Sequence, residues 1–114
     1  MSGIYAIISL MKATKNNIIE YLRQIKPELY KNGISSLALF GSFAKETQTV
    51  YSDIDIAISK DKNFLQKNTS YDYFDTVTMI KSKIRKQFHR NIDIFDLDSN
   101  SPFKESIKKE LIYV

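Results

Sequence analysis

The strongest constraint on the fold is the run "DIDIAIS", residues 53–59, in which polar and apolar residues alternate along most of its length. Successive side chains on a strand point to opposite faces, so the three isoleucines share one face and Asp53 and Asp55 share the other. The run therefore predicts a half-buried strand. The apolar run "ISSLALF", residues 34–40, predicts a strand before it, which ends abruptly at Gly41 and Ser42.

Helical patterns flank these strands. Apolar residues 18, 22 and 25 predict a helix from Lys15 to Ile25 that is broken near Pro27, with Gly33 as a left-handed cap before the first strand. Residues 60–70 read as a loop. Steps of three and four through residues 74, 77, 80, 84 and 88 then predict a long amphipathic helix.

The end of the chain predicts one more strand and one more helix. The strand is "NIDIFDL", residues 91–97, and the helix opens at Ser101 and Pro102 and buries Phe103, Ile107 and Leu111. Helices on one face of a sheet of about three or four strands make an α+β or open α/β domain.

Length and composition are those of one small globular domain. The 114 residues leave no room for a second folded domain, and we expect the domain to span residues 11–114, with residues 1–10 as an N-terminal extension. There is no cysteine, hence no disulfide or thiolate site, which is compatible with a reducing cytoplasm. No segment reads as a membrane span or a signal peptide, so we expect a cytoplasmic protein without membrane attachment.

The net charge of +4 comes largely from the helix and turn at residues 81–90. Such a run is most simply a solvated helix face, although an acidic partner could bind there. Basic and aromatic residues are not interleaved as in a nucleic-acid groove, so we do not expect direct binding to nucleic acid.

The two aspartates indicate cation chemistry. Side chains two apart on a strand place Asp53 and Asp55 on one side with Cα atoms about 6.5–7 Å apart. Oxygen ligands without nearby histidine or cysteine suit Mg²⁺, which shares its shell with substrate phosphates. The Gly41-Ser42 turn complements them, because glycine allows the backbone to approach an anion closely.

Ten residues separate Ser42 from Asp53, which gives the pattern G-S-x10-D-x-D. This pattern resembles the DNA polymerase beta-type nucleotidyltransferase superfamily, and "LALFGSFAKETQTVYSDIDIAIS" is most similar to its minimal nucleotidyltransferase branch. The resemblance implies a polymerase beta-like α+β fold with a small mixed sheet flanked by helices. It also implies that Gly41, Ser42 and Lys45 bind the nucleotide, with ATP as substrate, and that the aspartates hold two Mg²⁺ ions.

The superfamily completes its site with a third carboxylate from a later strand. The candidates are Asp93, Asp96 and Asp98. If the isoleucine faces of both strands pack under the helices, Asp93 points to the same side as Asp53 and Asp55, and Asp96 lies near a strand end, solvated or capping a loop. We therefore predict Asp53, Asp55 and Asp93 as catalytic and metal-binding residues.

The chain departs from the family at Lys45 and Glu46, where the family usually has Arg-Gly. Lysine keeps a positive charge for phosphate without the fork of arginine, and Glu46 adds a negative charge near the triphosphate. The single histidine, His89, is predicted to be a partial cation at a helix C-terminus rather than a general base. Tyr51 is the nearest candidate for stacking on a base.

Minimal nucleotidyltransferases of this length typically accompany a HEPN-type ribonuclease toxin and adenylylate one of its tyrosines. The resemblance thus implies an antitoxin that moves AMP from ATP to a partner toxin, in a homo- or hetero-oligomer. Two alternatives stay open: an antitoxin that only binds, with a degenerate site, and a nucleotidyltransferase that acts on a small molecule.

Overall fold

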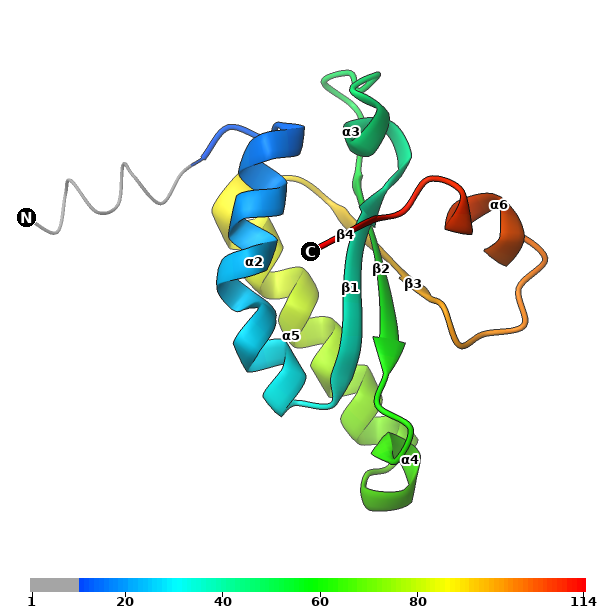
Figure 1. The fold of residues 1–114 in the computed structure, drawn as a ribbon. Helices are drawn as coiled ribbons and strands as arrows, with labels where there is room; N and C mark the ends of the chain where they lie inside the picture. The colour runs from blue at the N-terminus through cyan, green and yellow to red at the C-terminus, as the bar shows by residue number, and fades with distance from the viewer. Residues whose placement is uncertain (1–10) are drawn as a thin grey trace, which may run out of the picture.

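A computed structural model describes residues 11–114, so the predicted extension at residues 1–10 lies outside the described residues. Within them lies one sheet in the order β3-β2-β1-β4 (Figure 1). β1 (Ile34–Phe40) pairs antiparallel with β2 (Ile54–Lys60) and with β4 (Ile112–Tyr113), and β2 pairs parallel with β3 (Ile92–Asp96). The predicted α+β class with a small mixed sheet is confirmed.

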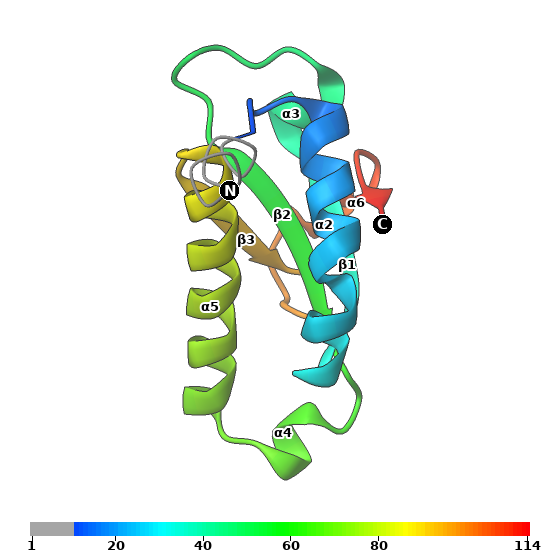
Figure 2. The same ribbon diagram turned by 90° about the vertical axis from the view of Figure 1, so that its left-hand side faces the viewer.

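Two long helices, α2 (Lys15–Lys31) and α5 (Ser70–Phe88), lie side by side against one face of the sheet (Figure 2). The isoleucine face of β2 and the leucines of β1 pack against them, as the alternation predicts. Each helix adds a buried stripe to this main core, composed of Ile18, Leu22, Ile25, Leu29, Ile80, Ile84 and Phe88.

The opposite face of the sheet carries only a small apolar cluster. Ala38, Ala57 and Leu97 form it, and Phe40, Phe95 and Leu111 pack against it. Among residues 11–114 no long helix covers this face, so the polar side chains of the alternating strand can lie there at the surface.

The helix predicted to break near Pro27 does not break. α2 continues to Lys31 with Pro27 inside it. Proline removes one N–H, which would have bonded to the carbonyl of Arg23, but Pro27 and Arg23 are both exposed. Water can bond to that carbonyl, so the helix continues at low cost. The prediction for Gly33 holds, since its φ is +92° directly after the helix.

Helix α5 is confirmed, and its buried stripe differs from the prediction only at the first position. Phe74 is 67% exposed, and Tyr73 packs against the core instead. The spacing from Tyr73 to Ile80 also fits a helical face, so spacing alone did not separate the two aromatic residues. The segment predicted as a loop contains the short helix α4 (Phe64–Lys67), which buries Phe64.

The last helix is shorter than predicted. α6 (Lys104–Lys108) leaves Phe103 exposed, and the chain then extends into β4 beside β1. The predicted continuation through Leu111 is therefore wrong, because pairing with the open edge of β1 satisfies the backbone there. Along residues 11–114, no helix combines the length and the apolar character needed to cross a membrane.

Candidate functional site

Three strands bring the predicted carboxylates to one end of the sheet. The register places Asp55 of β2 opposite Phe40, the last residue of β1, and beside Asp93 of β3. Paired residues point to the same face, so Asp55 and Asp93 both lie on the face away from α2 and α5. Asp53, immediately before β2, is close enough to affect the charge of Asp55. The predicted side for Asp93 is confirmed, and its catalytic role stays a prediction.

Glycine is required at position 41 because of its backbone conformation and its contact with Asp55. Its φ is +75°, a region that side-chain-bearing residues rarely adopt. A Cβ atom added to Gly41 would lie 2.1 Å from Oδ2 of Asp55. The glycine therefore lets the turn and the carboxylate lie in contact.

We expect Gly41→Ala to destabilise the fold by about 1–3 kcal/mol and to displace Asp55, because the backbone is strained and the new methyl group overlaps the carboxylate. Urea unfolding measures the first effect and nucleotide transfer the second. Gly33→Ala is a matched control, since Gly33 has a φ of +92° but its added Cβ would meet the Phe64 ring. Equal loss of transfer in the folded fraction of both variants would contradict the role of Gly41.

The short helix α3 (Gly41–Lys45) follows the turn at once and is anchored by the buried Phe43. Ser42 is partly exposed at its start. Lys45, in the last turn, forms a 2.9 Å ion pair from Nζ to Oε1 of Glu110. The predicted phosphate-binding cation is thus paired with a carboxylate from the C-terminal segment.

Negative charge is crowded around Asp55. Burial and, in decreasing order, the charges of Asp93, Asp53 and Glu110 together raise the pKa of its carboxyl group to about 6, against a smaller lowering by Lys45. Asp53 and Asp93 themselves are exposed. Such a cluster of carboxylates favours a bound cation, which would relieve their repulsion.

Glu46 does not add to this crowding. It adopts a left-handed conformation with φ of 58° as the cap of α3, which explains why glycine suits this position. Its carboxylate lies 3.8 Å from Nζ of Lys15, and both groups face solvent. The charge expected near a triphosphate is therefore directed to the start of α2.

The sequence profile described as "Polymerase beta, Nucleotidyltransferase" matches residues 23–114, which include the Gly41 turn and all three aspartates. The chain belongs to this nucleotidyltransferase family. The predicted resemblance is thereby confirmed at the level of the family.

Relatives of this nucleotidyltransferase occur in Methanocaldococcus jannaschii. The protein named "Putative protein adenylyltransferase MJ1379" is 36% identical over 104 residues, covering 89% of this chain and 98% of the relative. A second, "Putative protein adenylyltransferase MJ0126", is 32% identical over 109 residues, with the same shares covered. The match thus extends over nearly the full length of both relatives.

Solved structures share the fold of the nucleotidyltransferase. One described as "Structure of putative minimal nucleotidyltransferase" superposes with a TM-score of 0.65 at 17% identity, covering 88% of this chain and 95% of that one. Another, described as "Crystal structure of the toxin-antitoxin with AMP-PNP", gives a TM-score of 0.55 at 23% identity, covering 89% and 72%. At these identities the likeness concerns the fold.

Sequence reasoning about this nucleotidyltransferase missed Glu110. The residue falls within the predicted last helix, whereas in the structure the chain leaves α6 after Lys108 and β4 returns to β1. Glu110 thereby contacts Lys45 and lies near Asp55. No local pattern marks this residue, because its position depends on the pairing of β4.

We expect Glu110→Gln to tighten nucleotide binding about two- to fivefold, since it removes a negative charge and frees Lys45, and partly exposed pairs are worth about 0.2–1 kcal/mol. Titration with a fluorescent ATP analogue measures the affinity. Glu105→Gln, which removes the exposed pair with Lys108, is the control. Weaker binding by Glu110→Gln would mean instead that Glu110 holds Lys45 in its binding position.

Asp96 lies outside the site, on the helix face of the sheet. It accepts hydrogen bonds from Lys60 Nζ at 2.5 Å, Tyr73 Oη at 2.8 Å and the backbone N–H of Asp98 at 2.8 Å. Burial alone would raise its pKa, but these hydrogen bonds outweigh burial and hold the pKa below its usual value. Asp96 is half-buried, and of the two predicted alternatives, a solvated residue or a cap of the following loop, the hydrogen bond from the Asp98 N–H confirms the second.

The basic helix ends at the site. Lys83 pairs with Glu28 at 2.9 Å, and Arg85 donates a hydrogen bond to Asn91 at 2.6 Å. His89 caps α5 with φ of 55° and is exposed, as expected of a residue at a helix C-terminus.

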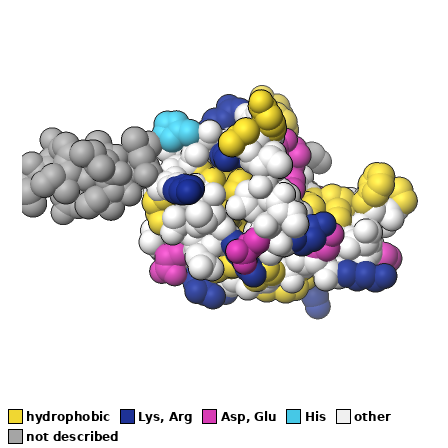
Figure 3. Space-filling view, turned by 90° about the horizontal axis from the view of Figure 1, so that it is seen from above, with side chains coloured by type: hydrophobic (Ala, Val, Ile, Leu, Met, Phe, Trp, Pro, Cys, Tyr) yellow, Lys and Arg dark blue, Asp and Glu magenta, His cyan; other side chains and the backbone are white. Residues whose placement is uncertain are grey.

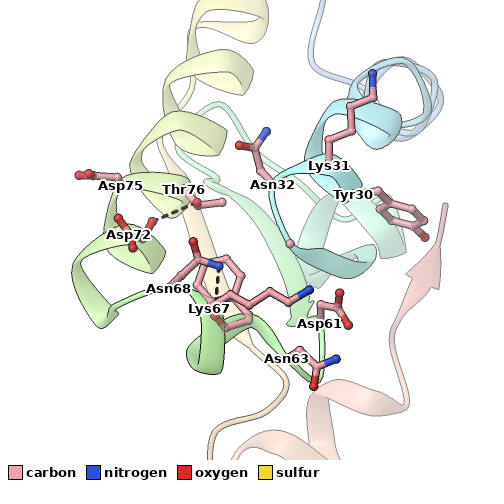
Figure 4. A pocket seen from close by; sticks show the side chains of 12 residues that line it. Tyr30, Lys31, Asn32, Asp61, Asn63, Lys67, Asn68, Asp72, Asp75 and Thr76 are labelled. Carbon is pink, nitrogen blue, oxygen red and sulfur yellow. Dashed lines mark hydrogen bonds between the residues drawn. The ribbon is translucent and has the colours of Figure 1, made fainter.

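A separate hollow of about 440 Å³ lies at the opposite end of the sheet (Figure 4). It is lined by the end of α2, the α4 segment and the start of α5, with Lys31, Asp61, Lys67 and Asp72 among the side chains. Asp61 follows the end of β2, whereas Asp53 precedes its start. This hollow is therefore distinct from the carboxylate site.

Proposed function

We propose that this nucleotidyltransferase moves AMP from ATP to a tyrosine hydroxyl of a partner HEPN-type toxin, and that the modification neutralises the toxin in the cytoplasm. The observation that carries the proposal is the meeting of Asp53, Asp55 and Asp93 with the Gly41 turn at one end of the sheet. Relatives named as adenylyltransferases of proteins support the protein acceptor. The toxin–antitoxin structure with AMP-PNP supports the partner and the nucleotide.

The carboxylate oxygens of Asp53 and Asp55 are suitable ligands for Mg²⁺. Within residues 11–114, no three histidine, aspartate or glutamate side chains are grouped closely enough to hold one metal ion by themselves. Asp53 and Asp55 would therefore share the ion with phosphate oxygens and water, as Mg²⁺ sites commonly do. Once bound, Mg²⁺ would neutralise negative charge on the carboxylates, on the attacking tyrosine oxygen and on the departing pyrophosphate.

The chain's own residues bind and orient the reactants. The backbone at Gly41 and Ser42 binds the triphosphate. Lys45 leaves its ion pair with Glu110 and binds a phosphate oxygen instead. Asp93 orients the tyrosine hydroxyl and accepts its proton. A bond forms between the tyrosine oxygen and the α-phosphorus, the bond from that phosphorus to the bridging oxygen breaks, and pyrophosphate leaves.

One rival function draws on a specific observation. Lys45 forms an ion pair with Glu110 and not with a phosphate. This contact favours a degenerate nucleotide site, in which case the chain neutralises its partner by binding alone. A test separates the two functions: the purified protein is incubated with the toxin, α-labelled ATP and Mg²⁺. Label on the toxin that requires metal and is lost in Asp53→Asn supports transfer. A tight complex without label supports the binding-only antitoxin.

A further inference from the structure

The loop of residues 46–53, between α3 and β2, has a fixed backbone. Nη1 of Arg90 donates hydrogen bonds to the carbonyl oxygens of Thr49 at 3.1 Å, Val50 at 3.2 Å and Ser52 at 2.9 Å. The guanidinium group of Arg90 also lies 5.4 Å from the centre of the Phe43 ring. A single arginine thus ties the loop to the start of β3 and to α3.

The same loop exposes its large side chains. Tyr51 is 91% exposed and Val50 is 78% exposed, the highest values for large hydrophobic residues in residues 11–114. Ser52 Oγ accepts a hydrogen bond from the Thr49 N–H at 2.9 Å, so the loop does not need these two side chains to keep its shape. A rigid loop that displays an aromatic and an aliphatic anchor loses little entropy on binding a protein.

The loop tip lies on the Asp93 side of the site. In the sheet order, Gly41 follows β1 and Asp93 belongs to β3, with Asp55 between them. Arg90, which holds the loop tip, lies just before β3. The nucleotide is proposed at Gly41, so the loop tip lies on the side from which an acceptor hydroxyl would come.

The anchors adjoin a basic hollow of about 480 Å³. Arg85, His89 and Arg90 line it together with Val50 and Tyr51, and within the described residues Asp53 is its only acidic lining residue. Viewed onto this end of the molecule, a projecting hydrophobic group lies next to Lys and Arg side chains, with the histidine close by (Figure 3). The hollow therefore complements acidic groups and connects directly to the site.

We propose that Val50, Tyr51, Arg85, His89 and Arg90 form the docking surface for the acceptor protein. The acceptor seats an apolar side chain against Val50 and Tyr51 and places acidic residues in the basic hollow, which brings its tyrosine to Asp93. This inference rests on the proposed function, because it takes the toxin as the acceptor. It adds the surface that selects the acceptor, separate from the residues that bind ATP.

The test uses the full chain, the purified HEPN-type toxin and the double variant Val50→Ser/Tyr51→Ser. We expect the Kd for the toxin and the KM for the toxin in transfer to rise about tenfold or more, as for loss of an interface anchor. The melting temperature is expected to stay unchanged, because both side chains are exposed. ATP affinity is measured for Val50→Ser and Tyr51→Ser separately, and loss of ATP binding in Tyr51→Ser would assign this side chain to base stacking and overturn its place in the docking surface. Arg85→Glu is expected to weaken toxin binding and to reduce its dependence on salt.

Tyr71→Ser is the matched control, since Tyr71 is 76% exposed but lies on the first turn of α5, away from the loop. If the wild type modifies the toxin and the double variant has the same KM for the toxin as the Tyr71→Ser control, the docking surface is wrong and the proposed function stands. If the toxin binds through these residues but is never labelled, the proposed transfer of AMP is wrong and the docking surface stands. No binding of toxin by the wild type would overturn the docking proposal.

Discussion

Asp55→Asn is expected to abolish nucleotide transfer and at the same time to stabilise the folded chain. Asp55 is half-buried among carboxylates, and its pKa is raised to about 6 from 3.8. A shift of this size equals about 3 kcal/mol, which solvent screening of a half-exposed group reduces to about 1–2 kcal/mol. Thermal unfolding with EDTA at pH 7 should show a melting temperature higher by about 4–8 °C per kcal/mol.

The stability gain has a defined pH dependence. Because the pKa of Asp55 is raised in the folded state, the wild type is destabilised above about pH 6, and this penalty disappears as the pH falls towards 4. The advantage of Asp55→Asn should disappear over the same window. Asp75→Asn, at an exposed position on α5, is the control. A variant less stable than the wild type at pH 7 would contradict the crowding of charge at this site.

Asp93→Asn is expected to reduce the transfer rate, whereas Asp96→Asn is expected to reduce the stability of the fold. Asp93→Asn should lower the transfer rate about 10²–10⁴-fold, the usual contribution of a positioned base, with little change in stability because Asp93 is exposed. Asp96→Asn should keep transfer but destabilise the fold by about 1–3 kcal/mol, since Lys60 and Tyr73 lose a charged partner. Steady-state kinetics and urea unfolding of both variants measure the two effects.

The Asp96 contribution should also depend on pH. Its pKa is lowered in the folded state, so its stabilisation is present at neutral pH and is lost as the pH falls below about 4, through the lowered value. A transfer defect in Asp96→Asn larger than that in Asp93→Asn would mean that Asp96 acts in catalysis, against the observed register of β3.

Much of the carboxylate site could be predicted from the sequence, because side chains on a strand alternate with a period of two. That rule placed Asp93 with Asp53 and Asp55, and away from Asp96, before any pairing was known. The strong turn signal at Gly41 likewise fixed the end of β1.

The remaining features depend on tertiary contacts that local patterns do not contain. Glu110 reaches Lys45 only because β4 pairs with β1, and a helical pattern hid that strand. Phe74 and Tyr73 are neighbouring aromatic residues, and Tyr73 is the one that packs against Phe64 and donates a hydrogen bond to Asp96. The clamp of Arg90 on the loop of residues 46–53 joins segments that are far apart in the sequence.

The most direct test of the central claim is the intact mass of the toxin after co-expression with this chain. We expect the mass of toxin that carries one or more AMP units with the wild type, unmodified toxin with Asp53→Asn/Asp55→Asn, and protection of cells by the wild type alone. Unmodified toxin together with full protection by the double variant would contradict it, because neutralisation would then need binding without transfer.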